Sequence, residues 1–279
     1  MRIINNKIDA IKELKRISNR TNSENNKKIN AIVEEILQEV RTYGDTAVEK
    51  YTKKFDGFNP NPMQVSVSDL KDAWDEIDNN LKLSLEVAYK RIKEFHEKEI
   101  PSSFTIEGKY GDVVQRKWRP VKNAGIYIPG GRAAYPSTVL MNAIPATVAG
   151  VKEIIMVSPG NKEGKINKTV LAAAYLAGIN KVFRIGGAQA IGALAFGTKQ
   201  ITKVDVISGP GNIYVTNAKK QIYGSTGIDS LAGPSEILII ADETAESTHI
   251  ASDLLAQAEH DHLFFYKDLL KLLLLDSWT

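Results

Sequence analysis

The sequence predicts an α/β protein built on a mostly parallel β-sheet. From Val113 onward, short apolar segments that fit strands alternate with longer helical segments. This alternation is typical of βαβ units, whose strands are buried on both faces by the connecting helices. Glycine-rich turns follow three of the predicted strands, at the sheet edge where such folds bind ligands.

The composition is that of an ordinary globular protein, with 43% hydrophobic and 25% charged residues in a chain of 279. The formal net charge of +3 is too small to indicate a nucleic-acid or membrane-surface partner. Cysteine is absent, which excludes disulfides and leaves nitrogen and oxygen ligands for any metal. Because we find neither a signal peptide nor a long apolar run, we expect a cytoplasmic protein.

The residues before Pro120 predict an exposed helical region, because charged side chains are denser there than in the rest of the chain. Apolar residues recur at helical spacing in four segments. These predicted helices cover residues 29–40, 48–55, 70–77 and 81–95. We expect Gly44 to end the first of them, and Ser68 or Asp69 to cap the third.

The residues after Val113 predict alternating strands and helices. The predicted strands cover residues 113–118, 124–128, 153–157, 181–185, 204–207 and 236–241. The predicted helices cover residues 137–151, 168–177, 188–196, 213–223 and 246–260.

Polar side chains accompany the glycine-rich turns at residues 128–131, 185–189, 208–212 and 232–235. Glycine allows a ligand to approach the backbone closely, and a following helix N-terminus offers free N–H groups to an anion. The short loops of an α/β protein also require Gly and Pro, and for any single turn this explanation is favoured. The side chains beside the turns are Tyr127, Gln189, Asn212 and Ser235. Taken together, these side chains favour a shared ligand cleft and ordinary loops about equally. The dinucleotide fingerprint G-x-G-x-x-G and the P-loop motif are both absent.

Gln257 and His260 lie three residues apart near the end of the last predicted helix, so their side chains share one face. An imidazole nitrogen and an amide oxygen can both bind a divalent cation. On spacing alone, a solvated histidine stabilised by the helix dipole is the favoured explanation.

Six segments, taken together and in order, resemble the histidinol dehydrogenase family. They are GIYIPGG (125–131), PSTVLMNAIPATVAGV (136–151), GGAQAIGALAFGT (186–198), KVDVISGPGNIYVTNAKK (203–220), AGPSEILIIAD (232–242) and ASDLLAQAEHD (251–261). The similarity runs from about Ile29 to Asp261. It implies a zinc-dependent, homodimeric enzyme of histidine biosynthesis, which oxidises L-histidinol to L-histidine through a bound aldehyde, with two hydride transfers to NAD.

The resemblance also implies roles for individual residues. The positions that match NAD contacts are Tyr127, Gln189 and Asn212. Ser235 matches a substrate contact, and Gln257 with His260 matches two zinc ligands that also touch substrate. Zinc bound there would orient the amino alcohol against the nicotinamide.

The implied organisation is a Rossmann-like, mostly parallel domain at about 121–235, inserted in a second, incomplete α/β domain. Residues 1–120 would form the helical part of that split domain. Residues 236–261 would return to it with the metal-ligand helix, and residues 262–279 would be an aberrant tail.

The resemblance stops after Asp261, and we expect a disrupted reading frame or an equivalent truncation. The family's Glu-His base, its other zinc ligands and a substrate-contacting Glu would then lie beyond this chain. No catalytic residue is therefore assigned, and we expect little or no turnover. The alternatives are a non-catalytic remnant that still binds a dinucleotide, or a general α/β binding module unrelated to histidine.

Overall fold

The computed structural model describes residues 6–18, 23–130, 134–231 and 244–260, together with the single residues 4, 239, 241 and 242. The chain divides into two compact units, one formed by Ile29–Gly233 and the other by Met1–Lys28 with Pro234–Thr279. The larger unit confirms the predicted α/β fold, because it contains a mixed sheet in which most neighbouring strands run parallel.

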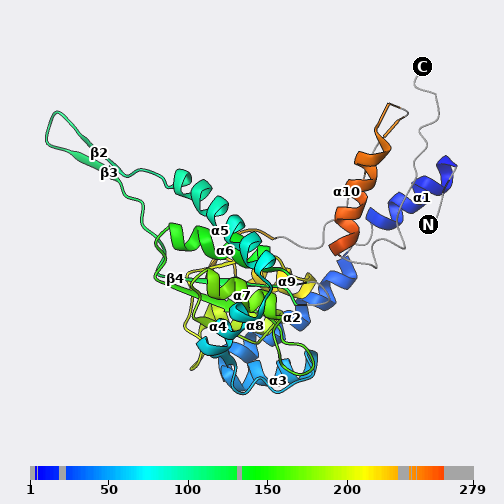
Figure 1. The fold of residues 1–279 in the computed structure, drawn as a ribbon, viewed down its shortest axis with the longest axis horizontal. Helices are drawn as coiled ribbons and strands as arrows, with labels where there is room; N and C mark the ends of the chain where they lie inside the picture. The colour runs from blue at the N-terminus through cyan, green and yellow to red at the C-terminus, as the bar shows by residue number, and fades with distance from the viewer. Residues whose placement is uncertain are drawn as a thin grey trace. The chain divides into compact units, whose positions relative to one another are not determined.

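The main sheet has the strand order β1-β6-β5-β4-β7-β8 (Figure 1). Its strands are β1 (Gln64–Val65), β4 (Asn123–Tyr127), β5 (Glu153–Val157), β6 (Lys181–Phe183), β7 (Val206–Ser208) and β8 (Gly227–Ile228). Only the β1–β6 pair is antiparallel among these neighbours. The chain proceeds from β4 outward through β5 to β6, then returns to the other side of β4 with β7. The strand order therefore reverses between β4 and β7, which is where doubly wound sheets open a ligand crevice.

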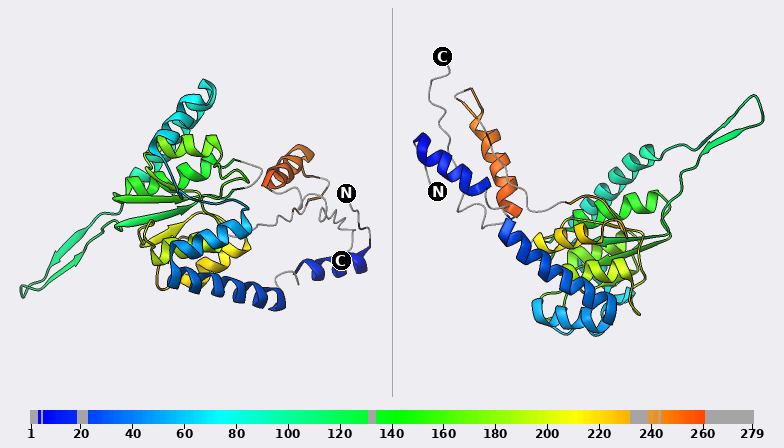
Figure 2. Two further views of the ribbon diagram at one scale, coloured as in Figure 1. Left: turned by 90° about the horizontal axis from the view of Figure 1, so that it is seen from below. Right: turned by 180° about the vertical axis from the view of Figure 1, so that it is seen from behind.

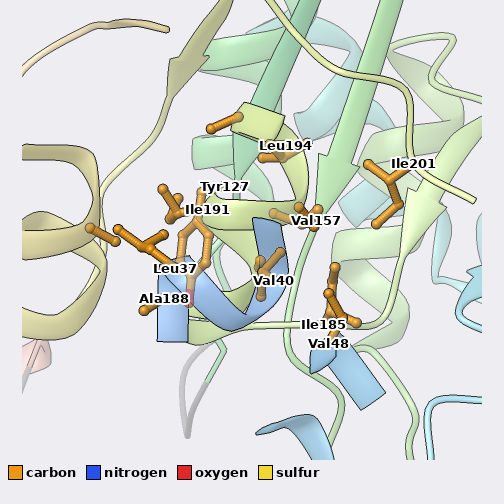
Figure 3. Close-up of a cluster of buried hydrophobic side chains, with 14 of the residues drawn as sticks. Leu37, Val40, Val48, Tyr127, Val157, Ile185, Ala188, Ile191, Leu194 and Ile201 are labelled. Atoms are coloured by element: carbon orange, nitrogen blue, oxygen red, sulfur yellow. The ribbon is translucent and has the colours of Figure 1, made fainter. Parts of the chain in front are cut away.

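Helices cover both faces of this sheet (Figure 2). They are α2 (Ser23–Tyr43), α3 (Asp45–Phe55), α4 (Val67–Glu76), α5 (Asn79–Glu99), α6 (Pro136–Val148), α7 (Lys168–Leu176), α8 (Gly187–Phe196) and α9 (Ile213–Ile222). Alternate strand residues point to opposite faces. Ile155 and Val157 of β5 accordingly join a core with α2, α3, α8 and α9, whereas Met156 joins a core with α4 to α7. Figure 3 shows the first core, in which Leu37 and Val40 of α2 lie close to Tyr127 and Ile191.

The residues from Ile29 to Pro120 belong to the same compact unit as the main sheet. Helix α3 packs on α8, α4 on α7 and α5 on α6, and β1 adds an edge strand beside β6. The change in charge density near Pro120 therefore falls inside one compact unit. It reflects the many charged residues on the outer faces of α2 to α5, whose inner faces are apolar. The split domain of residues 1–120 and 236–261 stays a prediction.

The helix ends follow recognisable local rules. Gly44 adopts a φ of 54° directly after α2, which confirms it as the stop of that helix. The prediction that Ser68 or Asp69 caps the helix now labelled α4 is wrong, because its N-cap is Ser66. The Ser66 hydroxyl accepts from the Asp69 N–H at 3.1 Å, and the Asp69 carboxylate accepts from the Ser66 N–H at 3.3 Å. This reciprocal pair is a capping box, which places Asp69 inside the first turn.

The strand predicted from Val113 lies outside the main sheet. It is β3 (Val113–Arg116), which pairs antiparallel with β2 (Phe104–Glu107) in an arm that extends from the body of the unit (Figure 1). Strand β2 was not predicted, although its sequence Phe-Thr-Ile-Glu alternates apolar and polar residues and so carried a strand signal. All eight strand residues of this arm are exposed.

The smaller unit contains α1 (Lys7–Ser18) and α10 (Ser247–His260), and α10 confirms the helix predicted at residues 246–260. The strand predicted at residues 236–241, apart from the single residues 239 and 241, and the tail at 262–279 lie outside the described residues. Within the described part of the chain, no helix combines the length and the apolar character that spanning a membrane requires.

Candidate ligand site

A cavity of about 510 Å³ lies at the carboxyl ends of the parallel strands in the larger unit. Tyr127 ends β4, Pro159 follows β5, Gln189 follows β6 and Asn212 follows β7, and all four residues line the cavity. The structure thus brings together the three residues at which NAD contacts are predicted. The volume is within the range of about 300–1,000 Å³ that is usual for small-molecule sites.

Tyr127 lies almost wholly buried at the end of β4, with 4% of its surface exposed. Its hydroxyl oxygen accepts a hydrogen bond from the Gly187 N–H at 3.2 Å, which joins β4 to the first residue of α8. Burial raises the pKa of Tyr127 to about 12, so the phenol keeps its proton at neutral pH. The hydroxyl is therefore a neutral, fixed polar group at the cavity wall.

Gln189 is the strongest indication of a ligand. The residue lines the cavity and is only 1% exposed, and neither Nε2 nor Oε1 of its side chain has a hydrogen-bond partner among the described residues. Leaving a buried polar group unsatisfied costs about 1–3 kcal/mol. Native proteins rarely accept this cost without a functional reason, and a ligand that pairs with the amide supplies one.

Asn212 has a structural role that is sufficient to explain its presence. It is the N-cap of α9, and its Oδ1 accepts hydrogen bonds from the N–H groups of Tyr214 at 3.0 Å and Val215 at 3.1 Å. Because the oxygen is used by the helix, the amide N–H groups of Asn212 are what it offers a ligand.

The first turns of α8 and α9 both contribute to the cavity, through Gly187 and Asn212. Each helix has ten residues, and its N-terminal end carries partial positive charge. The N–H groups of Gly187, Tyr214 and Val215 already have partners, in the Tyr127 hydroxyl and Asn212 Oδ1. Two such ends at one cavity favour a ligand that carries negative charge, such as a phosphate group.

The turn that carries Asn212 is held by a buried charge pair. Gly209 has a φ of 111°, and a side-chain carbon there would overlap the carbonyl oxygen of Tyr127. Lys219 is fully buried, and its Nζ donates to the Gly209 carbonyl at 3.0 Å and pairs with the Asp229 carboxylate. Asp229 in turn accepts from the Gly209 N–H at 2.8 Å. This pair was not predicted from the sequence, although a lysine among the apolar positions of α9 is a signal that could have identified it.

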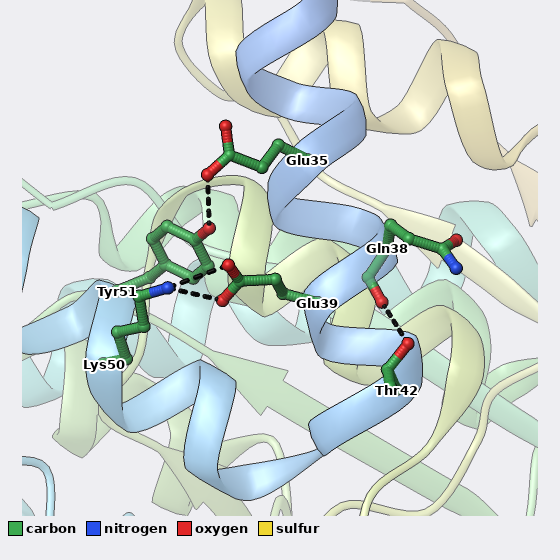
Figure 4. Close-up of polar contacts among 6 residues, drawn as sticks. All are labelled: Glu35, Gln38, Glu39, Thr42, Lys50 and Tyr51. Carbon is green, nitrogen blue, oxygen red and sulfur yellow. Dashed lines mark hydrogen bonds and ion pairs between the residues drawn. The ribbon is translucent and has the colours of Figure 1, made fainter.

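Helices α2 and α3 form the opposite wall of the cavity, with the stacked rings of Tyr51 and Phe55 5.8 Å apart. Figure 4 shows the Tyr51 hydroxyl donating to Glu35 at 3.4 Å, and the Lys50 ammonium paired with Glu39 at 2.7 Å. Burial raises the pKa of Tyr51 to about 12. No site residue was predicted in this region, because helical spacing does not reveal which distant turns a helix faces.

Asp56 follows α3 and also lines the cavity. Its Oδ2 is buried and has no hydrogen-bond partner among the described residues. Burial raises the pKa of this carboxyl to about 6. Asp56 is thus a second polar group at the cavity whose environment is unfavourable without a ligand.

The predicted zinc and substrate residues are not placed by the described side chains. Ser235 lies outside the described residues, and so do the side chains of Gln257 and His260, whose backbone belongs to α10 of the smaller unit. Within the part of the chain that the structure describes, no group of three or more His, Asp or Glu residues is arranged to hold a metal ion. The zinc site stays a prediction.

The fold and the site define a class of protein: a doubly wound α/β protein with a ligand-sized cavity at its strand switch point. Residues 19–265 match the family model described as histidinol dehydrogenase. The chain is 86% identical to the histidinol dehydrogenase of Prochlorococcus marinus (strain MIT 9312) over 263 residues, which is 94% of this chain and 60% of that protein. It is 52% identical to the enzyme of Gloeobacter violaceus over 265 residues, again 94% of this chain and 60% of the relative.

A solved structure supports the same assignment. The crystal structure of histidinol dehydrogenase from Elizabethkingia anophelis superimposes with a TM-score of 0.76 at 42% identity, covering 82% of this chain and 53% of that one. The chain therefore belongs to the histidinol dehydrogenase family, as its motifs predict. It spans about 60% of the length of the curated relatives that it matches.

Proposed function

We propose that the cavity is the coenzyme site of a histidinol dehydrogenase and that it binds NAD. The observation that carries this proposal is the buried, unpartnered amide of Gln189, which lies beside Tyr127 and two helix N-termini in a single cavity. In this arrangement the first turns of α8 and α9 bind the pyrophosphate. Gln189 and Tyr127 donate hydrogen bonds to polar groups of the coenzyme and accept hydrogen bonds from them.

The proposed reaction is the oxidation of L-histidinol to L-histidine with two molecules of NAD. Each NAD would accept one hydride. The residues at the cavity bind and orient the coenzyme. The Gly209 turn lets the backbone approach β4 closely, and the exposed ring of Phe55, which stacks on the buried Tyr51, offers a flat apolar surface to an aromatic or ribosyl group. Fixing the coenzyme in this way reduces the entropic cost of reaching the transition state of hydride transfer.

We further propose that Gln257 and His260 bind zinc and that Ser235 contacts the substrate, as the family motifs imply. Nitrogen and oxygen donors of this kind suit Zn²⁺, and a catalytic site normally has three protein ligands and one open position. Two ligands on one helix would bind zinc weakly. Whole-enzyme turnover, the homodimer and a cytoplasmic location are likewise proposals, since this chain covers about 60% of its relatives.

Isothermal titration of the 279-residue chain with NAD tests the coenzyme site. The expected result is saturable binding with one NAD per chain, which is weakened at least tenfold in Gln189→Ala. Asp72→Asn, an exposed substitution on α4, is the control and should bind as the parent does. An absence of NAD binding in the folded parent would refute the proposal.

NADH formation from L-histidinol, measured with and without added zinc, tests the reaction. NADH formation would support the proposed oxidation of L-histidinol by this chain. NAD binding without turnover would instead favour the non-catalytic dinucleotide-binding alternative for this chain.

A further inference from the structure

Asp56 occupies a position that is unfavourable for a carboxylate in the free protein. It is the C-cap of α3, where the helix dipole is negative. Its Oδ2 is buried without a partner among the described residues, and its charge is one of the causes that raise the pKa of Tyr127 across the cavity. A carboxylate kept in such a place is a candidate for contact with a hydrogen-bond donor on the ligand.

Doubly wound folds that bind NAD usually place an acidic residue at the end of the second strand, where it accepts hydrogen bonds from a ribose hydroxyl. In this chain the second strand of the parallel set is β5, and it is followed by Ser158, Pro159 and Gly160. Pro159 lines the cavity, and these three residues include no carboxylate. Glu163, further along the same loop, pairs with Lys165 and is not among the residues that line the cavity. The usual acceptor is therefore missing from its usual place.

Two carboxylates line the cavity among the described residues, Glu35 and Asp56. Glu35 is exposed and already accepts a hydrogen bond from the Tyr51 hydroxyl. Asp56 is the more buried of the two and retains an unpartnered oxygen. It is therefore the better candidate for the missing acceptor, although it comes from α3 and not from the parallel sheet.

We propose that Asp56 determines coenzyme specificity: its carboxylate accepts hydrogen bonds from a ribose of the dinucleotide and excludes the additional phosphate of NADP. This inference rests on the proposed NAD site. A phosphate ester carries about −1.5 to −2 charges at neutral pH, and a partly buried carboxylate repels it more strongly than a solvated one does. Lys54 is the one basic residue among the described cavity-lining residues, and its side chain lies over the Tyr51 and Phe55 rings.

The test is to measure the Kd of NAD and of NADP for the parent chain, Asp56→Asn and Asp56→Ser. Glu35→Gln is the matched comparison, because it removes the other carboxylate of the same cavity. The parent is expected to prefer NAD. Asp56→Asn should bind NAD about ten- to a hundredfold more weakly, because a charged acceptor is replaced by a neutral one, and should bind NADP more tightly than the parent does. Asp56→Ser should change in the same direction.

The outcomes distinguish this inference from the proposed function. If the parent binds NAD and both Asp56 variants keep its ratio of NAD to NADP affinity, the specificity role is wrong and the coenzyme site stands. An equal change in the ratio of NAD to NADP affinity in Glu35→Gln would also overturn the inference. It would show that the preference for NAD depends on the total negative charge of the cavity and not on Asp56. A parent chain that binds neither coenzyme would overturn both proposals. Thermal melting checks the fold of every variant, and Asp56→Asn should melt no lower than the parent because it removes a buried charge.

Discussion

Replacing Lys219 with methionine tests whether the buried charge pair holds the Gly209 turn in place. Methionine keeps most of the apolar stem and removes the ammonium group. The change deletes one hydrogen bond to the Gly209 carbonyl and the ion pair with Asp229. The Asp229 carboxylate would still accept from the N–H groups of Gly209 and Ser230, at 2.8 and 2.6 Å.

The expected cost follows from burial. Lys219 is fully buried, whereas the Asp229 side chain is 33% exposed, so water can partly replace the lost partner of Asp229. Hydrogen bonds to charged groups contribute about 1.5–3 kcal/mol each, and we expect a net loss of about 3 kcal/mol in the free energy of unfolding. For a unit of this size that loss corresponds to a decrease of roughly 6–12 °C in Tm.

Thermal melting and NAD titration of Lys219→Met measure both consequences. Lys220→Met, the exposed neighbour on the same helix, is the control and should leave both values unchanged. Asp229→Asn should cost about 3–5 kcal/mol, because it leaves the Lys219 ammonium buried without a counter-charge. The double variant should lose less than the sum of the single losses. A Lys219→Met protein with the parental Tm and the parental NAD affinity would refute this account of the turn.

Three further substitutions test other parts of the site. Gln189→Met removes the unsatisfied amide and should raise the free energy of unfolding by about 1–3 kcal/mol while weakening NAD binding; a lower Tm with unchanged binding would contradict it. Asp56 has a pKa of about 6 in place of 3.8, so the native state holds this proton more tightly than the unfolded chain does. The contribution of Asp56 to stability should therefore fall as the pH rises from about 4 to about 6 and stay constant above that. Asp56→Asn should remove this slope from a plot of Tm against pH. Gly209→Ala should destabilise the fold by more than about 1 kcal/mol, and by more than Gly178→Ala, which has a φ of 76° but no atom within 4 Å of the added carbon. Equal losses of Tm in the two alanine variants would show that the overlap with the Tyr127 carbonyl is unimportant.

The sequence by itself determined the α/β class and most of the strands, and its motifs identified the family. It indicated a shared cleft for Tyr127, Gln189 and Asn212 no more strongly than ordinary loops, and the structure places these three residues at one cavity. The fold predictions succeeded because they depend on local rules. Buried parallel strands are short and apolar, and their carboxyl ends necessarily meet at one edge of the sheet. A residue directly after such a strand is therefore positioned by its own neighbours in the chain.

Only the tertiary structure decided which distant segments complete the cavity. Asp56, Tyr51 and Phe55 reach it because the apolar faces of α2 and α3 pack on the sheet beside α8. The amphipathic spacing of these helices predicts a buried face but does not specify the surface that covers it. The pairing of Lys219 with Asp229 likewise depends on how α9 and the segment after β8 come together, since a buried charge is tolerated only where the fold supplies its partner.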